Sequence, residues 1–239
     1  MSRLVRPTRL TKLAVCAGAV VIVWTAAFLL IRYDALPWLL PVHFKRNGDP
    51  NGWQYKTYAR VLLPVFVQLA LGGTLGGVSA LLLSRPHGGD NDRADLEEEE
   101  TPDKKAAAVA AEAVVFLAFI WVSFQAYGAW ALSQMWMRER AGLGVGYTML
   151  ELTGIVLTIL IAVRAQLGLG RPLPKPFNSE HWRLGHLYNN PADPALFVPT
   201  RKGDRWTLNF GRPVAAALMG LILVVGIVGP AVILTLLLR

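Results

Sequence analysis

The residues that could carry catalytic or metal chemistry are few and far apart along the chain. The four histidines are His43, His87, His181 and His186. Only the last two are close in sequence, and their spacing suits neither one face of a helix nor a usual pair of zinc ligands. The sequence contains no His-Glu-x-x-His, Gly-x-Ser-x-Gly or phosphate-binding Gly-Lys motif. We therefore expect no catalytic residues, no metal site and no cofactor.

Polar side chains inside apolar segments are a second kind of candidate. Glu112, Gln125, Glu151 and Arg164 lie within or beside long hydrophobic runs, where an ionisable group is costly and often functional. Glu112 and Arg164 are expected at similar depths and could form an interhelical ion pair. Alternatively, Arg164 extends to the interface and Glu112 lies in the interface itself. In a transporter, the four side chains would line a polar path.

Long apolar runs carry these residues and indicate a membrane protein. Of the 239 residues, 54% are hydrophobic and 17% are charged, and the mean hydropathy is +0.40. Five runs are long enough to cross about 30 Å of hydrocarbon. The first could instead be a signal peptide, but it is longer than a usual signal core and lacks a small-residue cleavage site. The predicted spans are residues 13–31, 61–83, 113–137, 145–167 and 213–238.

The distribution of lysine and arginine predicts the orientation of these spans. With the N-terminus in the cytoplasm, segments 1–12, 84–105 and 164–212 hold sixteen basic residues, and the opposite side holds eight. Cytoplasmic segments usually carry this excess, so we expect the N-terminus inside and the C-terminus outside. The net charge of +8 then reflects topology and contact with anionic headgroups rather than nucleic-acid binding.

These spans define an all-α polytopic fold with five transmembrane helices and a small cytoplasmic aromatic element with a β-hairpin. The hairpin is predicted from the β-prone runs 195–199 and 205–210 around Lys202-Gly203-Asp204, with Trp206 and Phe210 packing on Phe197 or on the membrane. The predicted segments are a basic arm (1–12), two helices (13–83) with an outer loop (32–60), an acidic, disordered linker (84–105), two helices (106–168), the aromatic segment (169–212) and the last helix (213–239).

Two local patterns add expectations about packing. Gly72, Gly73, Gly76 and Gly77 place small residues at helical spacing on the second span, which favours close helix packing within the chain over dimerisation. The outer loop is rich in turn residues, and its tryptophans and tyrosines are expected in the membrane interface.

Two segments resemble known families. The outer segment Leu36-Pro37 … Val42-His43-Phe44 … Gly48-Asp49-Pro50-Asn51-Gly52-Trp53 resembles a membrane domain of bacterial SdpI-type proteins, which include immunity proteins against a sporulation-delaying peptide toxin. The cytoplasmic segment Tyr188-Asn189-Asn190-Pro191 … Asp193-Pro194 … Phe197-Val198-Pro199 … Trp206-Thr207-Leu208-Asn209-Phe210 is similar to an uncharacterised domain that often accompanies it. The chain lacks the "GIR…PWT" stretch of the immunity proteins. The resemblance implies a bacterial inner-membrane protein.

We expect a non-enzymatic protein that binds a peptide, a membrane component or a protein partner, by resemblance in immunity, envelope stress or signalling. The alternatives are a transporter or small-solute permease, and a structural subunit of a larger complex or a homo-oligomer. The candidate binding residues are Pro37, His43, Phe44, Gly48 and Trp53 in the outer loop, and Trp182, Tyr188, Asn190, Asp193, Trp206 and Asn209 in the cytoplasmic segment.

Overall fold

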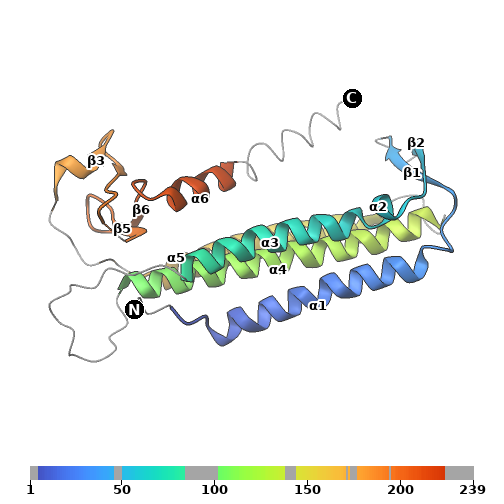
Figure 1. The fold of residues 1–239 in the computed structure, drawn as a ribbon, viewed down its shortest axis with the longest axis horizontal. Helices are drawn as coiled ribbons and strands as arrows, with labels where there is room; N and C mark the ends of the chain where they lie inside the picture. Colours follow the sequence, from blue (N-terminus) through green and yellow to red (C-terminus); the bar gives the residue numbers. More distant parts are fainter. Residues whose placement is uncertain are drawn as a thin grey trace. The chain divides into compact units, whose positions relative to one another are not determined.

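A computed structural model describes residues 5–45, 50–83, 102–137, 144–170, 172, 177–193 and 195–223 of the chain (Figure 1). The contacts divide the chain into two compact units. Residues 7–81 and 111–166 form the first, here called the helical unit. Residues 1–6, 82–110 and 167–239 form the second, and its residues 177–212 are here called the aromatic module.

Among the described residues, four helices are long and apolar enough to cross a membrane. They are α1 (Arg9–Arg32), α3 (Leu63–Leu83), α4 (Pro102–Trp136) and α5 (Gly144–Gly168), and they match four of the predicted spans. Together they indicate a multi-pass membrane protein. The fifth predicted span begins with α6 (Pro213–Leu223), and the rest of it lies outside the described residues. Four spans are therefore supported rather than five.

The helix ends differ from the predicted boundaries. Thr8 precedes α1, and its side-chain oxygen accepts a hydrogen bond of 3.0 Å from the backbone N–H of Thr11, as is usual for an N-cap. Helix α4 begins at Pro102, inside the segment predicted to be a disordered linker, and proline is favoured at such a first position. Residues 84–101 of that linker lie outside the described residues.

The outer segment was predicted as a turn-rich loop, and this was incomplete. It contains β1 (Leu39–Phe44) and β2 (Pro50–Tyr55), which pair antiparallel. Leu39 lies opposite Tyr55, and Pro41 opposite Trp53, with a register shift between Pro41 and His43. Prolines are tolerated here because each strand of a two-stranded hairpin is an edge strand. The short helix α2 (Tyr58–Val61) follows.

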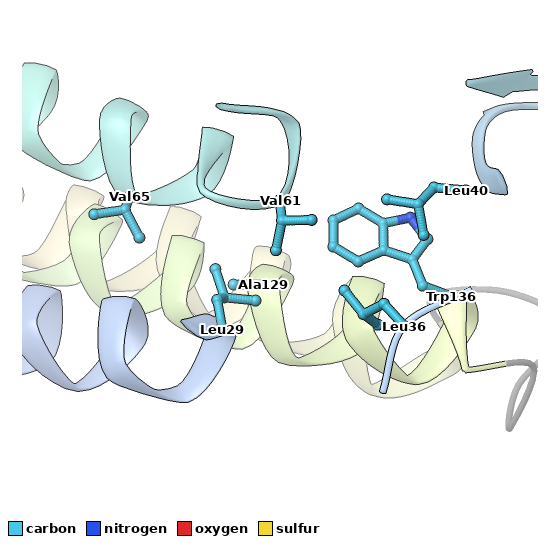
Figure 2. Close-up of a cluster of buried hydrophobic side chains, with 7 residues drawn as sticks. All are labelled: Leu29, Leu36, Leu40, Val61, Val65, Ala129 and Trp136. Atoms are coloured by element: carbon cyan, nitrogen blue, oxygen red, sulfur yellow. The ribbon is translucent and has the colours of Figure 1, made fainter. Parts of the chain in front are cut away.

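A cluster of buried apolar side chains seats this hairpin on the helices (Figure 2). Trp136, at the end of α4, packs among residues from α1, β1, α2 and α3, and its indole N–H donates a buried hydrogen bond of 3.1 Å to the carbonyl oxygen of Pro41. The hairpin is therefore a fixed extension of the helical unit. The cluster contains Leu29, Leu36, Leu40, Val61, Val65, Ala129 and Trp136.

The aromatic module consists of short strands. The predicted hairpin is present as β5 (Phe197–Pro199) and β6 (Trp206–Leu208), and Gly203 in its turn has a positive φ of 71°. A second hairpin, which we did not predict, pairs β3 (Trp182–Arg183) with β4 (Leu187–Tyr188) after the 3-10 helix η1 (Ser179–His181). A single parallel bridge between Tyr188 and Asn209 connects the two hairpins.

Candidate functional site

The two strands of the hairpin β1–β2 differ in burial. Leu40 and Pro41 are buried against the helices, whereas Trp38 is 76% exposed and Trp53 is 47% exposed. Tyr55 is also exposed. Large amphipathic rings are therefore held at a fixed position beside the end of the helical unit.

Lys56 stabilises the base of this hairpin through hydrogen bonds to the backbone. The sequence did not indicate this role. Its ammonium group donates hydrogen bonds of 3.0 Å and 2.9 Å to the carbonyl oxygens of Tyr33 and Leu36. The same nitrogen lies 4.7 Å from the centre of the Tyr33 ring, which itself stacks on Tyr58 at 4.0 Å. A lysine here satisfies carbonyls just beyond the C-terminal end of α1. Nothing in the local pattern distinguishes it from an ordinary surface lysine.

The predicted residues of the outer segment are only partly brought together. His43 is exposed and lies opposite Gly52, one residue before Trp53. A Cβ atom on Gly52 would lie 2.7 Å from the Cβ atom of His43, so the close approach of the strands requires glycine there. Pro37 is half-buried. The side chain of Phe44 and all of Gly48 lie outside the described residues.

The ion pair between α4 and α5, one of the two arrangements considered for these side chains, is present. Nη1 of Arg164 lies 2.7 Å from Oε1 of Glu112, and the two side chains are 60% and 10% exposed. The hydroxyl of Thr8 donates a hydrogen bond of 2.5 Å to Oε2 of Glu112. Thr8 was not predicted, although Thr-x-x-Thr before an apolar run is a visible N-cap signal. The carboxylate of Glu112 thus joins the start of α1 to α5.

The two other predicted polar residues do not extend this group. Glu151 is exposed on α5 and Gln125 is half-buried, and no described contact connects either one to Glu112. The interior polar contact is made instead by Gln68, whose side-chain amide donates to Oγ1 of Thr25 (3.1 Å) and to the carbonyl oxygen of Val122 (2.9 Å). These bonds link α3 to α1 and α4.

The glycines of α3 have different surroundings. A Cβ atom on Gly72 would lie 3.7 Å from Ile22 and 3.8 Å from Val122, so this glycine faces α1 and α4. Around Gly73, Gly76 and Gly77, nothing lies within 4 Å of such an atom. Within the part of the chain that the structure describes, packing therefore involves Gly72 and not the other three glycines.

Asn209 organises the aromatic module from a fully buried position. Its amide nitrogen donates to the carbonyl oxygens of Asn190 (2.8 Å), Asp193 (3.1 Å) and Ala195 (3.1 Å). Its amide oxygen accepts from the backbone N–H groups of Asn190 and Gly211, each at 3.0 Å. The side chain is therefore occupied by the fold and has no group free to contact a partner.

Tyr188, Asn190 and Asp193 also bond within the module. The hydroxyl of Tyr188 donates to Oδ2 of Asp193 at 3.0 Å, and the amide oxygen of Asn190 accepts from the backbone N–H of Ala192. Burial, followed by the negative charge of Asp193, raises the pKa of Tyr188 above its ordinary value. Trp206 donates its indole N–H to the carbonyl oxygens of Leu169 and Gly170, each at 3.1 Å, which ties the module to the end of α5.

Two of the predicted module residues, Trp182 and Tyr188, line a small cleft with a volume of about 60 Å³. Their rings meet edge to face with centroids 5.3 Å apart. Trp206, Asn190, Asp193 and Asn209 do not line it. The lining residues are Phe177, Asn178, His181, Trp182, Tyr188, Val198, Pro199, Thr200 and Arg201.

Comparison with known proteins gave one family match. Residues 20–67 match the family described as a domain of unknown function (DUF1648), a domain found in SdpI-like membrane proteins. The match includes most of α1, the hairpin β1–β2, α2 and the start of α3. No curated protein matched the chain. No solved structure matched it either.

Proposed function

We propose that the protein is a non-enzymatic protein of the bacterial inner membrane that binds a peptide or a membrane component through the hairpin β1–β2. In this proposal the N-terminus is cytoplasmic, the hairpin is outside and the aromatic module is cytoplasmic, as the distribution of basic residues predicts. The observation that carries the proposal is the hairpin itself, whose strand β1 is buried at Leu40 and Pro41 whereas its strand β2 exposes the rings of Trp53 and Tyr55.

Exposed tryptophans on a fixed hairpin favour binding for an energetic reason. Trp and Tyr supply large contact areas with few rotatable bonds, so little entropy is lost when a partner binds. The buried hydrogen bond from Trp136 and the two bonds from Lys56 already hold the hairpin in place. The outer ends of the spans would present Trp38 and Trp53 where a membrane-inserted peptide or lipid headgroup arrives.

In this proposal, α4 transmits ligand binding at the hairpin to the other side of the membrane. Trp136 contacts the hairpin, and Glu112 lies 24 positions earlier on the same helix, which corresponds to about 36 Å. That length exceeds a hydrocarbon core of about 30 Å. A ligand that displaced the hairpin would tilt α4 and so bias the contacts of Glu112 with Thr8 and Arg164.

Site-specific photo-crosslinking in intact bacteria tests the binding proposal. We expect a photoreactive amino acid at Trp53 to form a discrete adduct with a peptide or membrane component. The control is the same replacement at Trp24, an exposed tryptophan on α1 that is outside the hairpin. Identical adducts at both positions, or none at Trp53, would contradict the proposal.

Alanine substitutions provide a second test of the binding proposal. Trp53→Ala and His43→Ala should change the sensitivity of cells to membrane-active peptides or envelope stress, whereas Trp24→Ala should not. Chromatography of tagged variants in detergent checks that expression is equal. Wild-type sensitivity in both hairpin variants would lead us to abandon this function.

A structural subunit of a larger complex is the second candidate, because α5 leaves most of its apolar side chains exposed and carries an exposed Glu151. A charge facing lipid costs about 3 kcal/mol near a helix centre, and a partner helix would remove that exposure. If Glu151→Leu lowers the mass of the complex extracted in mild detergent while the monomer stays folded, this candidate gains support.

A further inference from the structure

The cleft in the aromatic module combines rings with a cationic rim. Phe177, Trp182 and Tyr188 form aromatic walls, and the guanidinium of Arg201 lies 4.7 Å from the centre of the Phe177 ring. Arg201 is exposed, so its charge remains available at the mouth of the cleft while its plane rests on the ring. Aromatic residues and arginine are also the types that dominate binding energy at protein interfaces.

The size of the cleft limits what it can hold. A cavity of about 150 Å³ accommodates one benzene molecule, and this cleft measures about 60 Å³. It is therefore too small to enclose a metabolite. The cleft can take only the branched end of one aliphatic side chain that enters from a partner.

The basic residues around the cleft favour a negatively charged ligand. Lys202 and Arg205 are exposed near Arg201. A hydrogen bond from Thr200, and then the positive charges of Arg205 and Lys202, hold the pKa of Asp204 below its ordinary value. The aromatic module has three acidic residues, Glu180, Asp193 and Asp204, and five basic residues, Arg183, Arg201, Lys202, Arg205 and Arg212.

We propose that the cleft binds an acidic peptide segment of a protein partner. One aliphatic side chain of the peptide packs on the rings of Phe177 and Trp182, whose centroids lie 6.4 Å apart, and a neighbouring carboxylate pairs with Arg201. The pairing can be bidentate, because a guanidinium presents two parallel N–H donors to a carboxylate. This site is separate from the hairpin β1–β2, so failure of either proposal leaves the other intact.

The test uses the full-length protein in detergent and a fluorescein-labelled synthetic peptide in which a leucine is flanked by aspartates and glutamates. Fluorescence polarisation should report saturable binding. Arg201→Glu should weaken the affinity by about tenfold or more, and Phe177→Ala should weaken it as well. The matched control is Arg183→Glu, which makes the same charge change at an exposed residue that does not line the cleft, and it should leave the affinity nearly unchanged. Equal thermal unfolding of the variants shows that they remain folded.

Several results would overturn the proposal. Equal losses in Arg201→Glu and Arg183→Glu would indicate a diffuse positive surface. Equal binding of a peptide with serine in place of leucine would show that no side chain enters the cleft. Competition by anionic-lipid nanodiscs, lost in Arg201→Glu, would identify a lipid headgroup as the occupant. Binding that occurs only after residues 97–100 are changed to glutamine would identify this chain's own acidic segment instead.

Discussion

Single polar side chains stabilise each unit internally. They form hydrogen bonds with backbone N–H and carbonyl groups that would otherwise be buried without partners. In the aromatic module, one amide of Asn209 bonds to five backbone groups. Next to it, a Cβ atom on Gly211 would lie 2.5 Å from backbone atoms of Asn190 and Pro191. The motif that suggested binding residues is therefore largely a folding motif, because its polar atoms are used inside the module.

Replacing this amide should destabilise the module strongly. Asn209→Ala removes the acceptor of two part-buried backbone N–H groups and the donor to three carbonyl oxygens, at a cost of about 3 kcal/mol or more. Limited proteolysis between residues 177 and 212 should become much faster. Asn189→Ala is the control, because no described hydrogen bond involves that side chain. Equal protease resistance of the two variants would contradict the role of Asn209.

The raised pKa of Tyr188 leads us to expect that the module becomes less stable at alkaline pH. The pKa of Tyr188 in the folded protein is raised above the ordinary tyrosine value of about 10 by burial and by Asp193, so the unfolded chain loses this proton first. The stability that Tyr188 contributes is complete below about pH 10 and is lost as the pH rises through its folded pKa. Chemical denaturation across this range should show a falling midpoint. Tyr188→Phe should have a shallower fall, and an unchanged slope would count against this explanation.

At the scale of elements, the arrangement of strands and helices depends on contacts between distant segments. The hairpin β1–β2 is two-stranded and could not be stable by itself. It is held by Trp136 from α4 and by Lys56 at its base. Its geometry therefore follows from the helices.

Removing the hydrogen bond of Trp136 should weaken the attachment of the hairpin to the helices while an aromatic ring still fills the buried cluster. Trp136→Phe keeps most of the ring and loses the bond to Pro41, so we expect a loss of about 1 kcal/mol. Trp136→Ala should cost about 3 to 5 kcal/mol because it also opens a cavity. Thermal unfolding in detergent measures both changes, and Trp24→Phe should have little effect. Equal melting temperatures for Trp136→Phe and Trp136→Ala would rule out the packing role.

The contact between α4 and α5 can be measured with a double-mutant cycle. Arg164→Gln should destabilise more than Glu112→Gln, because the mostly buried carboxylate would lose its cation whereas the mostly exposed guanidinium can reach water. We expect a coupling energy of about 0.6 to 1 kcal/mol in detergent-based unfolding. Strictly additive effects would mean that the pair contributes nothing to the association of the helices.

At the scale of the whole molecule, the number of spans determines the location of the C-terminus. With α1, α3, α4 and α5 crossing and the N-terminus inside, the aromatic module is cytoplasmic, and a further crossing after Pro213 would place the C-terminus outside.

Fusions of alkaline phosphatase, which is active only outside the cytoplasm, test this arrangement. We expect no activity for a fusion after residue 212 and clear activity for one after residue 239. A green fluorescent protein series at the same positions should give the opposite pattern. If both phosphatase fusions are inactive, the chain has four spans and its two ends lie in the same compartment.

The sequence by itself determined the apolar helices and the hairpin β5–β6, and it placed Glu112 and Arg164 at similar depths, whereas their pairing was decided by the tertiary structure. Hydropathy and turn residues are local properties, so they can be read along the chain. The depth of a charged residue in the membrane follows from its distance to the end of its span. The tertiary structure alone decided that Lys56 locks the base of the outer hairpin, that Asn209 is buried, and that Glu151 is exposed whereas Glu112 is not. Those outcomes depend on which distant segments meet, because the environment of a side chain is set by its neighbours in space rather than by its neighbours along the chain.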